Sequence, residues 1–525
     1  MIIVNNIASL KSVTSLPSDS LAYVQGHTSQ SDGGGGMFQW RTDSDYTGTG
    51  LLNIDNNGTV VSSNTNPNGK WVRQYDSYIN VLFFGAFGKD QDYTTHIQNA
   101  IDFGTLISVS NLSIKGATVF FPNGKYRIKH LLLKSNISLI GESIGGTHLV
   151  SNDIGTQDQF LFDIDFGAVY LDIKNFTING KIDTNTNKGC FLFEAKSDPV
   201  AGHGGLWYSR LSNISIVNFN GNSIYLKGGT NWQLPNQFNI FENVRVLKGA
   251  DWGYALKISG QCGQHTFLNC QFDGFYRNDT FSLGPNVYIL TPANSPGSAV
   301  ISFINSTFQD SDYGVLIDNS ENITFDNCWL ENLGVAIVIN NSNAINVLNS
   351  RFANAAGFGK PTPHNIVNGQ NINITNSFVN VHRNFVSVSN ISQISSGSAF
   401  FSTANNILGA VNLSDNYFAD LKLSAGFNTN SIVGGGQIVC GGNKYISLKQ
   451  TGANFNAISS KLNPGEYLTV TANGTINFNQ SASLLLAGKT LLQLLNNEVA
   501  TFLRLDGNGS METFTLISFS KANSV

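Results

Sequence analysis

The stretch "FINSTF", residues 303–308, places an apolar residue two positions before an asparagine and a further apolar residue three positions after it. The same pattern returns as "FDNCWL" at 325–330 and "VLNSRF" at 347–352, and its asparagines lie 22 residues apart. An earlier copy is "FLNCQF" at 267–272, and looser copies surround Asn213, Asn243 and Asn376. Repetition at a fixed short period indicates that one structural unit is stacked many times.

One such unit is a short apolar strand with polar turns, too small to bury its own apolar face, so stacked copies must build a continuous core. A period of this length predicts the coil of a right-handed parallel β-helix. We expect asparagines at one phase to stack as a hydrogen-bonded ladder, and Cys270 and Cys328 share a phase as well. A leucine-rich repeat has a similar length, but its leucine pattern is missing.

The composition agrees with an all-β chain and excludes several classes of function. Only 12 % of the 525 residues are charged, the net charge is -4, and there are 53 glycines. Without a Lys/Arg cluster we expect no nucleic-acid partner, and without a long apolar run we expect no membrane insertion. The five cysteines form no CxxC pair, so we expect neither a disulfide framework nor a zinc site. No cofactor or metal is expected.

Residues 84–101, "FGAFGKDQDYTTHIQNAI", followed by "GATVFFPNGKYRI" (116–128) and "NISLIGE" (136–142), resemble the first coils of pectate-lyase-like β-helices. The resemblance implies a helix near 95–104 that caps the open end of the β-helix, and Thr95 and Gln98 fit a capping box there. Lys89 and Tyr93 stand where that family usually has acidic residues, so an ion bound in this loop is not implied.

Upstream, "LAYVQGHTSQSDGGGGMFQW" (21–40), "DNNGTVV" (55–61), "GKWVRQ" (69–74) and "INVLFFGA" (79–86) resemble, in order, the neck of bacteriophage tailspike depolymerases. The resemblance implies a homotrimer on a virion tail that cuts capsular polysaccharide or lipopolysaccharide O-antigen at the host surface. The four glycines of this neck, residues 33–36, are expected to follow a tight backbone path, with Phe38 and Trp40 buried beyond them.

Three regions are expected: a neck over 1–80, the β-helix over 81–450, and a small β-sandwich-like C-terminal domain over 451–525 that aids trimerisation or binds sugar. Tailspikes usually carry a virion-attachment domain before the neck, and only about twenty residues precede it here. We therefore expect either a trimmed chain or a spike docked onto the phage tail or another spike protein. No secretory signal is recognisable, which suggests synthesis in the host cytoplasm.

The register of the repeats selects the candidate catalytic residues. If Phe272, Phe308, Leu330 and Phe352 point into the core, the residues that follow them face solvent on one sheet. The carboxylates that gather there on neighbouring coils are Asp273, Asp310 and Glu331. We expect Glu331 to be a general acid and Asp310 or Asp273 the base of a glycosidase. The alternative is that these aspartates only cap backbone N–H groups at turns.

Residues near 276–298 exceed the coil length and should loop out beside this acidic patch. Candidate polysaccharide-binding residues are Tyr276, Arg277, Trp252, Gln309 and Arg351. Three functions fit: an endoglycosidase; a lyase with Tyr276 or His265 as base and Arg277 or Arg351 as the neutralising cation; and a non-catalytic receptor-binding spike. The isolated histidines do not predict a metal site.

Overall fold

The computed structural model describes residues 1–14, 17, 19–48, 50–110, 116–152, 160–164, 167–180, 189–197, 204–230, 234–249, 253–274, 276–277, 280–353, 362–367, 372–375, 378–380, 386–389, 411–412, 417–418, 437–441, 445–448, 453–455, 457–460, 464–472, 474–495, 498–505 and 513–520. The chain divides into two compact units, Met1–Ile301 and Ser302–Val525. Among the described residues, no helix is long and apolar enough to cross a membrane.

The first unit begins with a small sheet whose strands run in the order β1-β2-β3-β5-β4. Strands β2, β3, β5 and β4 pair antiparallel, and β1 adds in parallel to β2. Phe38, Trp40 and Trp71 form the core of this sheet and are at most 1 % exposed. The elements are β1 (Ile2–Val4), α1 (Ile7–Lys11), β2 (Leu21–Val24), β3 (Gly36–Arg41), β4 (Val60–Ser62) and β5 (Lys70–Arg73).

The glycine run follows the tight path that the sequence predicts. A Cβ on Gly35 would lie 2.6 Å from the carbonyl oxygen of Val24, which is backbone and cannot move aside. The Arg73 guanidinium, 3 % exposed, donates hydrogen bonds to the carbonyl oxygens of Gly34 (2.8 Å) and Gly35 (2.6 Å). Arg73 also lies over the ring of Phe38, 4.5 Å from its centroid. The run is therefore a packed part of the neck.

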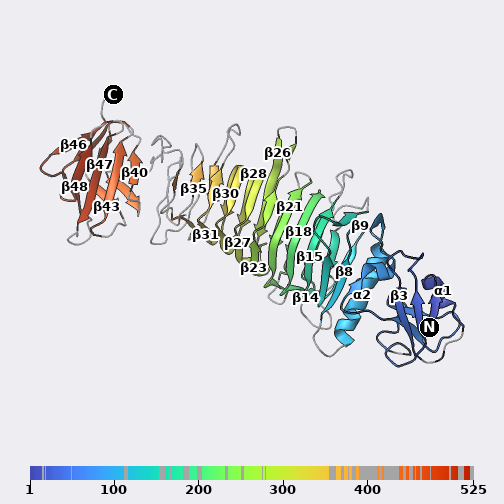
Figure 1. Ribbon diagram of the computed structural model, residues 1–525. Coiled ribbons are helices and arrows are strands. Elements are labelled where there is room, and N and C mark those ends of the chain that lie inside the picture. Colours follow the sequence, from blue (N-terminus) through green and yellow to red (C-terminus); the bar gives the residue numbers. More distant parts are fainter. Residues whose placement is uncertain are drawn as a thin grey trace. The chain divides into compact units, whose positions relative to one another are not determined.

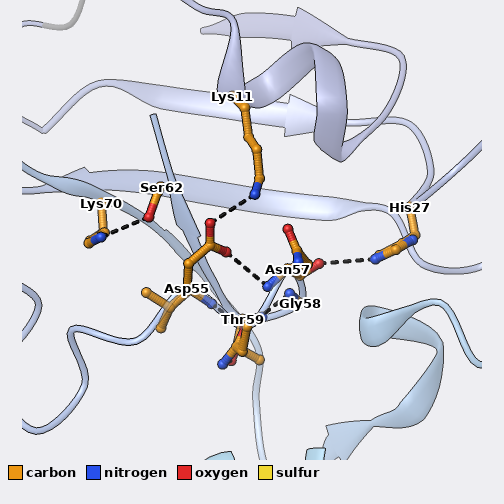
Figure 2. A network of polar contacts seen from close by, with 10 residues as sticks. Lys11, His27, Asp55, Asn57, Gly58, Thr59, Ser62 and Lys70 are labelled. Carbon is orange, nitrogen blue, oxygen red and sulfur yellow. Dashed lines mark hydrogen bonds and ion pairs between the residues drawn. The ribbon is translucent and has the colours of Figure 1, made fainter. Parts of the chain in front are cut away.

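A polar network ties the separate loops of the neck together (Figure 2). Lys11, at the end of α1, forms an ion pair of 2.8 Å with Asp55, whose other carboxylate oxygen accepts from the Asn57 N–H. His27 contacts the Asn57 carbonyl oxygen through Nε2 at 3.0 Å. The side chain of Asn56 accepts from three successive backbone N–H groups, those of Gly58, Thr59 and Val60. These contacts fix the turn that "DNNGTVV" marks in the sequence.

The neck leads into the first coils of the β-helix, which lie beside helix α2 in Figure 1. The side chains of Ile79, Ala117 and Ile137 lie around Gly104 of that helix, so α2 packs over the start of the stack. The elements are β6 (Ile79–Asn80), the 3-10 turn Val81–Phe84, β7 (Lys89–Asp92), α2 (Thr94–Ser110), β8 (Ala117–Phe121), β9 (Gly124–Ile128), β10 (Leu131–Leu133), β11 (Ile137–Gly141) and β12 (Thr147–Ser151).

Successive coils then pair in parallel through the rest of the first unit, visible as stacked arrows from β8 to β26 in Figure 1. Their strands are β13 (Phe160–Ile164), β14 (Gly167–Val169), β15 (Asp172–Asn179), β16 (Gly189–Glu194), β17 (Gly205–Trp207), β18 (Arg210–Phe219), β19 (Ile224–Lys227), β20 (Asn236–Gln237), β21 (Ile240–Lys248), β22 (Leu256–Ser259), β23 (Cys262–Leu268), β24 (Gln271–Asp273), β25 (Tyr276–Arg277) and β26 (Thr280–Leu290).

Apolar side chains align from coil to coil and fill the interior. One such column is buried throughout: Ile79, Val119, Leu139, Ile173, Leu211, Phe241 and Phe267. Within it the rings of Phe241 and Phe267 stack 4.7 Å apart. Burial raises the pKa of the Cys270 and Cys328 thiols to about 12, so both are neutral thiols packed in the interior. Within the first unit, the repeat thus builds an apolar core that runs from coil to coil.

The predicted asparagine ladder is present at a corner of the coils. Asn243 donates from its side-chain amide to Asn213 (3.1 Å), and Asn213 donates to Asn175 (3.3 Å). In the second unit, Asn327 donates to Asn305 at 2.7 Å. All five residues have φ between 51° and 66°, the left-handed region that asparagine tolerates better than most residues. Each ladder position therefore both turns the backbone and bonds to the next coil.

The second unit contains further parallel coils and ends in sheets that mix parallel and antiparallel pairs. Its coil strands are β27 (Ala299–Ile304, which spans the boundary), β28 (Thr307–Asp318), β29 (Glu321–Asp326), β30 (Trp329–Asn340), β31 (Asn343–Leu348), β32 (Arg351–Ala353), β33 (Thr362–Val367), β34 (Ile372–Thr375), β35 (Phe378–Asn380), β36 (Val386–Ser389), β37 (Val411–Asn412) and β38 (Tyr417–Phe418).

The C-terminal part has a sheet of order β40-β43-β47-β48-β45 and a smaller sheet of order β41-β44-β46. Leu468, Phe478, Phe502 and Phe514 come from both sheets and share one core, as in a β-sandwich. The strands are β39 (Gln437–Gly441), β40 (Tyr445–Leu448), β41 (Ala453–Phe455), β42 (Ala457–Ser460), β43 (Tyr467–Ala472), β44 (Ile476–Asn479), β45 (Leu484–Leu485), β46 (Leu491–Leu494), β47 (Val499–Leu505) and β48 (Thr513–Ser520).

Candidate active site

Three of the residues selected from the sequence lie together on the second unit. Gln309 of β28 pairs with Glu331 of β30. Two residues before Glu331 on the same strand, Trp329 pairs with Arg351 of β32. Trp329 is 40 % exposed, and the Arg351 guanidinium lies over its ring, 4.5 Å from the centroid. Glu331 and Gln309 are half-buried. We call Gln309, Trp329, Glu331 and Arg351 the Trp329 face.

Asp310 is placed differently from its neighbour Gln309. Its φ is 62°, so the chain turns a corner there, and its carboxylate accepts a hydrogen bond of 3.1 Å from Asn332 on the next coil. This is the same device as the asparagine ladder, with an aspartate as the acceptor. The contact lies at a turn, but its donor is a side-chain amide and not the backbone N–H group that the alternative for these aspartates expects.

The solvent-facing position predicted for Asp273 is wrong. Phe272 is buried as expected, but Asp273 is also buried, with 2 % of its surface exposed, and accepts a 2.7 Å hydrogen bond from Gln271. The reason is the insertion that follows. Asn286, on the returning strand of that insertion, is fully buried and donates to the Phe272 carbonyl oxygen at 3.1 Å, so the insertion covers this end of the coil.

The predicted loop after residue 276 is a hairpin, in which Tyr276 pairs antiparallel with Phe281 and Arg277 with Thr280. The side chains of Tyr276 and Arg277 lie outside the described part of the chain, and Trp252 lies outside it altogether. His265 cannot serve as a lyase base as considered above, because it is 1 % exposed and burial lowers its pKa to about 3.

The structure also brings together a second group of charged residues that the repeat register does not reveal. Two outward-facing columns run across strands β13, β16, β19, β22 and β26 of the first unit. One column contains Asp163, Leu192, Tyr225, Lys257 and Tyr288. The other contains Glu194, Lys227, Ser259 and Leu290. We call the polar members of these columns, together with Lys196 and Tyr254, the Lys257 face.

Two carboxylates of this face share one ammonium group. Lys196 Nζ lies 3.6 Å from Asp163 Oδ2 and 3.8 Å from Glu194 Oε2. The two oxygens are therefore no farther apart than the sum of these distances, about 7.4 Å, which is compatible with the ~5 to 9.5 Å between the carboxyl groups of glycosidases. Glu194 also pairs with Lys227 at 2.5 Å.

The environments of these two carboxylates differ. Burial raises the pKa of Asp163 above its usual value, although the Lys196 charge opposes the shift. Hydrogen bonding to Glu194 raises the pKa of Lys227, which keeps that lysine charged beside Glu194. A carboxyl whose pKa is raised by burial, next to a second carboxylate that is paired with a lysine, is the kind of difference in environment that an acid–base pair requires.

The sequence holds only a faint signal for this face. "FLFDI" (160–164), "FLFE" (191–194), "IYLK" (224–227) and "LKIS" (256–259) each place one or two polar residues in an apolar strand, in a chain that is poor in charge. These strands carry no asparagine motif, so their register could not be assigned from the sequence. Among the described residues, no group of three or more His, Cys, Asp or Glu side chains could hold a metal ion.

Comparison with known proteins shows what this chain is similar to in sequence and in fold. Residues 3–76 match a family model described as the phage tail protein small four-stranded beta-sheet domain, which corresponds to the antiparallel strands of the neck. The tailspike protein gp49 of Acinetobacter baumannii bacteriophage Fri1, a capsular polysaccharide depolymerase, superposes with a TM-score of 0.55 and 17 % identity over 80 % of this chain and 75 % of its own.

The chain has the parallel β-helix fold of phage tailspikes. The full-length tailspike protein 2 of Escherichia coli O157:H7 bacteriophage CAB120 shares this tailspike fold at a TM-score of 0.50 and 15 % identity, over 98 % of this chain and 71 % of its own. In sequence, a Mu-like prophage FluMu defective tail fiber protein of Haemophilus influenzae is 23 % identical over 370 residues, 69 % of this chain. The chain spans about half of the length of that relative.

Proposed function

We propose that this protein is a tailspike depolymerase: an endoglycosidase, carried on a phage tail, that cleaves a bacterial surface polysaccharide at the Lys257 face. The observation that carries the proposal is the pair formed by Asp163 and Glu194, which Lys196 bridges on an accessible surface of the β-helix. The tailspike fold and the depolymerase activity of the Fri1 protein support the class of substrate.

In this mechanism Asp163 is the general acid. Burial raises its pKa, which is the direction that a general acid requires, and the protonated carboxyl donates its proton to the oxygen of the glycosidic bond as that bond breaks. Glu194, paired with Lys227, is the partner that activates water or attacks the sugar directly. The anomeric configuration of the first released product distinguishes these two routes, because inversion requires direct attack by water.

The competing assignment uses Glu331 as the acid with Asp310 or Asp273 as the base. It is the weaker of the two because Asp310 is bonded to Asn332 at a corner and Asp273 is buried. We propose that Trp329 and Arg351 instead bind a further part of the polymer, since they offer an exposed ring and a cation.

A lyase is the second candidate, and one observation favours it. Lys257 lies over the ring of Tyr225 on the same face, so a cation and a potential base are close together. Burial also lowers the pKa of Lys257. Incubation with a panel of purified capsular polysaccharides separates the possibilities. We expect a fall in chain length with new reducing ends and no new near-ultraviolet absorbance. New absorbance would show a lyase, and unchanged chain length across the panel would favour a binding spike.

A further inference from the structure

Lys257 of β22 is the centre of an aromatic cluster on the Lys257 face. Its ammonium nitrogen lies 4.9 Å from the ring centroid of Tyr225, 5.5 Å from that of Tyr254 and 6.0 Å from that of Tyr288. Tyr225 is held in turn by a 2.9 Å hydrogen bond between its hydroxyl and Ser259. Contact with ring faces attracts a cation and fixes its position. The ammonium is therefore held in place.

Lys257 differs from the other lysines of this face in its ion pairing. Lys196 and Lys227 are ion-paired with Asp163 and Glu194. Within the part of the chain that the structure describes, no carboxylate forms an ion pair with Lys257. Burial, and then the charge of Lys227, lower the pKa of Lys257, which shows that the site disfavours this positive charge while it lacks an anion.

We propose that Lys257 binds a carboxylate group of the polysaccharide, so that the substrate is an acidic polysaccharide containing carboxylated sugars. This inference rests on the proposed function and names its substrate class. An incoming carboxylate gains a charge-assisted hydrogen bond from the ammonium, while the tyrosine rings pack against the apolar faces of the sugar. The three lysines of this face outnumber its two acids, and this excess of positive charge favours the same choice of substrate.

The register also locates the carboxylate relative to the reacting bond. Lys257 lies three coils from Asp163 in the same column, which is about 14 Å at the ~4.8 Å spacing of neighbouring strands. The carboxylate therefore belongs to a sugar other than those joined by the cleaved bond. Removing Lys257 should weaken binding without altering the acid and base themselves, so binding is the appropriate quantity to measure.

The test uses the full chain carrying Asp163→Asn, which removes the proposed acid and keeps the polymer intact. Binding is measured by biolayer interferometry to a panel of purified acidic capsular polysaccharides, each native and with its carboxyl groups reduced to alcohols. We expect at least one native polymer to bind at least tenfold more tightly than its reduced form. Adding Lys257→Met should abolish that difference, and Lys257→Arg should retain most of it.

Lys89→Met is the matched control, because Lys89 also lies over an aromatic ring, that of Phe87 at 5.8 Å, but on strand β7. It should leave the preference unchanged. Equal binding of native and reduced polymers, a preference that survives Lys257→Met, or binding to none of the panel would overturn the inference. Release of polymer fragments by the Asp163→Asn protein would instead refute the acid assignment of the proposed function. The preference for native over carboxyl-reduced polymer can still be measured in that case.

Discussion

Single residues in the neck show how tightly a glycine position can be specified. A Cβ on Gly35 would lie 2.9 Å from the Gln25 carbonyl as well as against Val24, so Gly35→Ala should lower the free energy of unfolding by about 1–3 kcal/mol. Gly145→Ala is the control, since nothing lies within 4 Å of its added Cβ. Urea unfolding followed by tryptophan fluorescence measures both. Equal stability of the two variants would contradict the packed path.

The buried His265 predicts a dependence of stability on pH. Its pKa of about 3 in the folded chain lies below the 6.5 of the free side chain, so between these values only the unfolded chain binds the proton. Stability should therefore fall as pH falls from 6.5 towards 3, by up to about 1.4 kcal/mol per pH unit. His265→Gln removes this contribution. Urea midpoints of both proteins at pH 7, 6 and 5 test it, and parallel pH profiles would refute it.

At the scale of the elements, each corner asparagine does two separable things. Asn327 adopts a φ of 52° and donates a 2.7 Å hydrogen bond to Asn305. Asn327→Gly keeps the backbone conformation and should cost only the hydrogen bond, about 0.5–1.5 kcal/mol. Asn327→Ala should cost about 1–2 kcal/mol more, because alanine is strained at positive φ. Thermal unfolding of the two variants checks this order, and a glycine variant no more stable than alanine would contradict it.

The sequence predicts those elements in which one residue type meets one backbone requirement. Asparagine at the coil corners and glycine in the neck are of this kind, and they gave the coil phase and the packed glycine path. The Lys257 face was not predictable, because Asp163 and Glu194 meet only through the pairing of strands separated by loops of unequal length. Asp273 was misplaced for a related reason: the hairpin inserted after it buries the position that strand alternation alone exposes.

For the whole molecule, the tailspike fold supports the proposal that the chain is a homotrimer. Its mass is 56.7 kDa, so light scattering of the purified chain should give three times that value. The mass should stay constant on dilution through the micromolar range, as an obligate assembly requires. A mass equal to one chain at all concentrations would contradict the homotrimer and would place the whole binding surface within one subunit.

The central claim is that cleavage takes place on the Lys257 face and not on the Trp329 face. It is tested by the rate of reducing-end release from a cleaved capsular polysaccharide, measured for Glu194→Gln and Glu331→Gln, with melting curves to show that both variants are folded. Glu194→Gln should lose at least about 100-fold of the rate, and Glu331→Gln should keep a rate within about twofold of the unmodified chain. Full activity of Glu194→Gln together with an inactive, folded Glu331→Gln would contradict it.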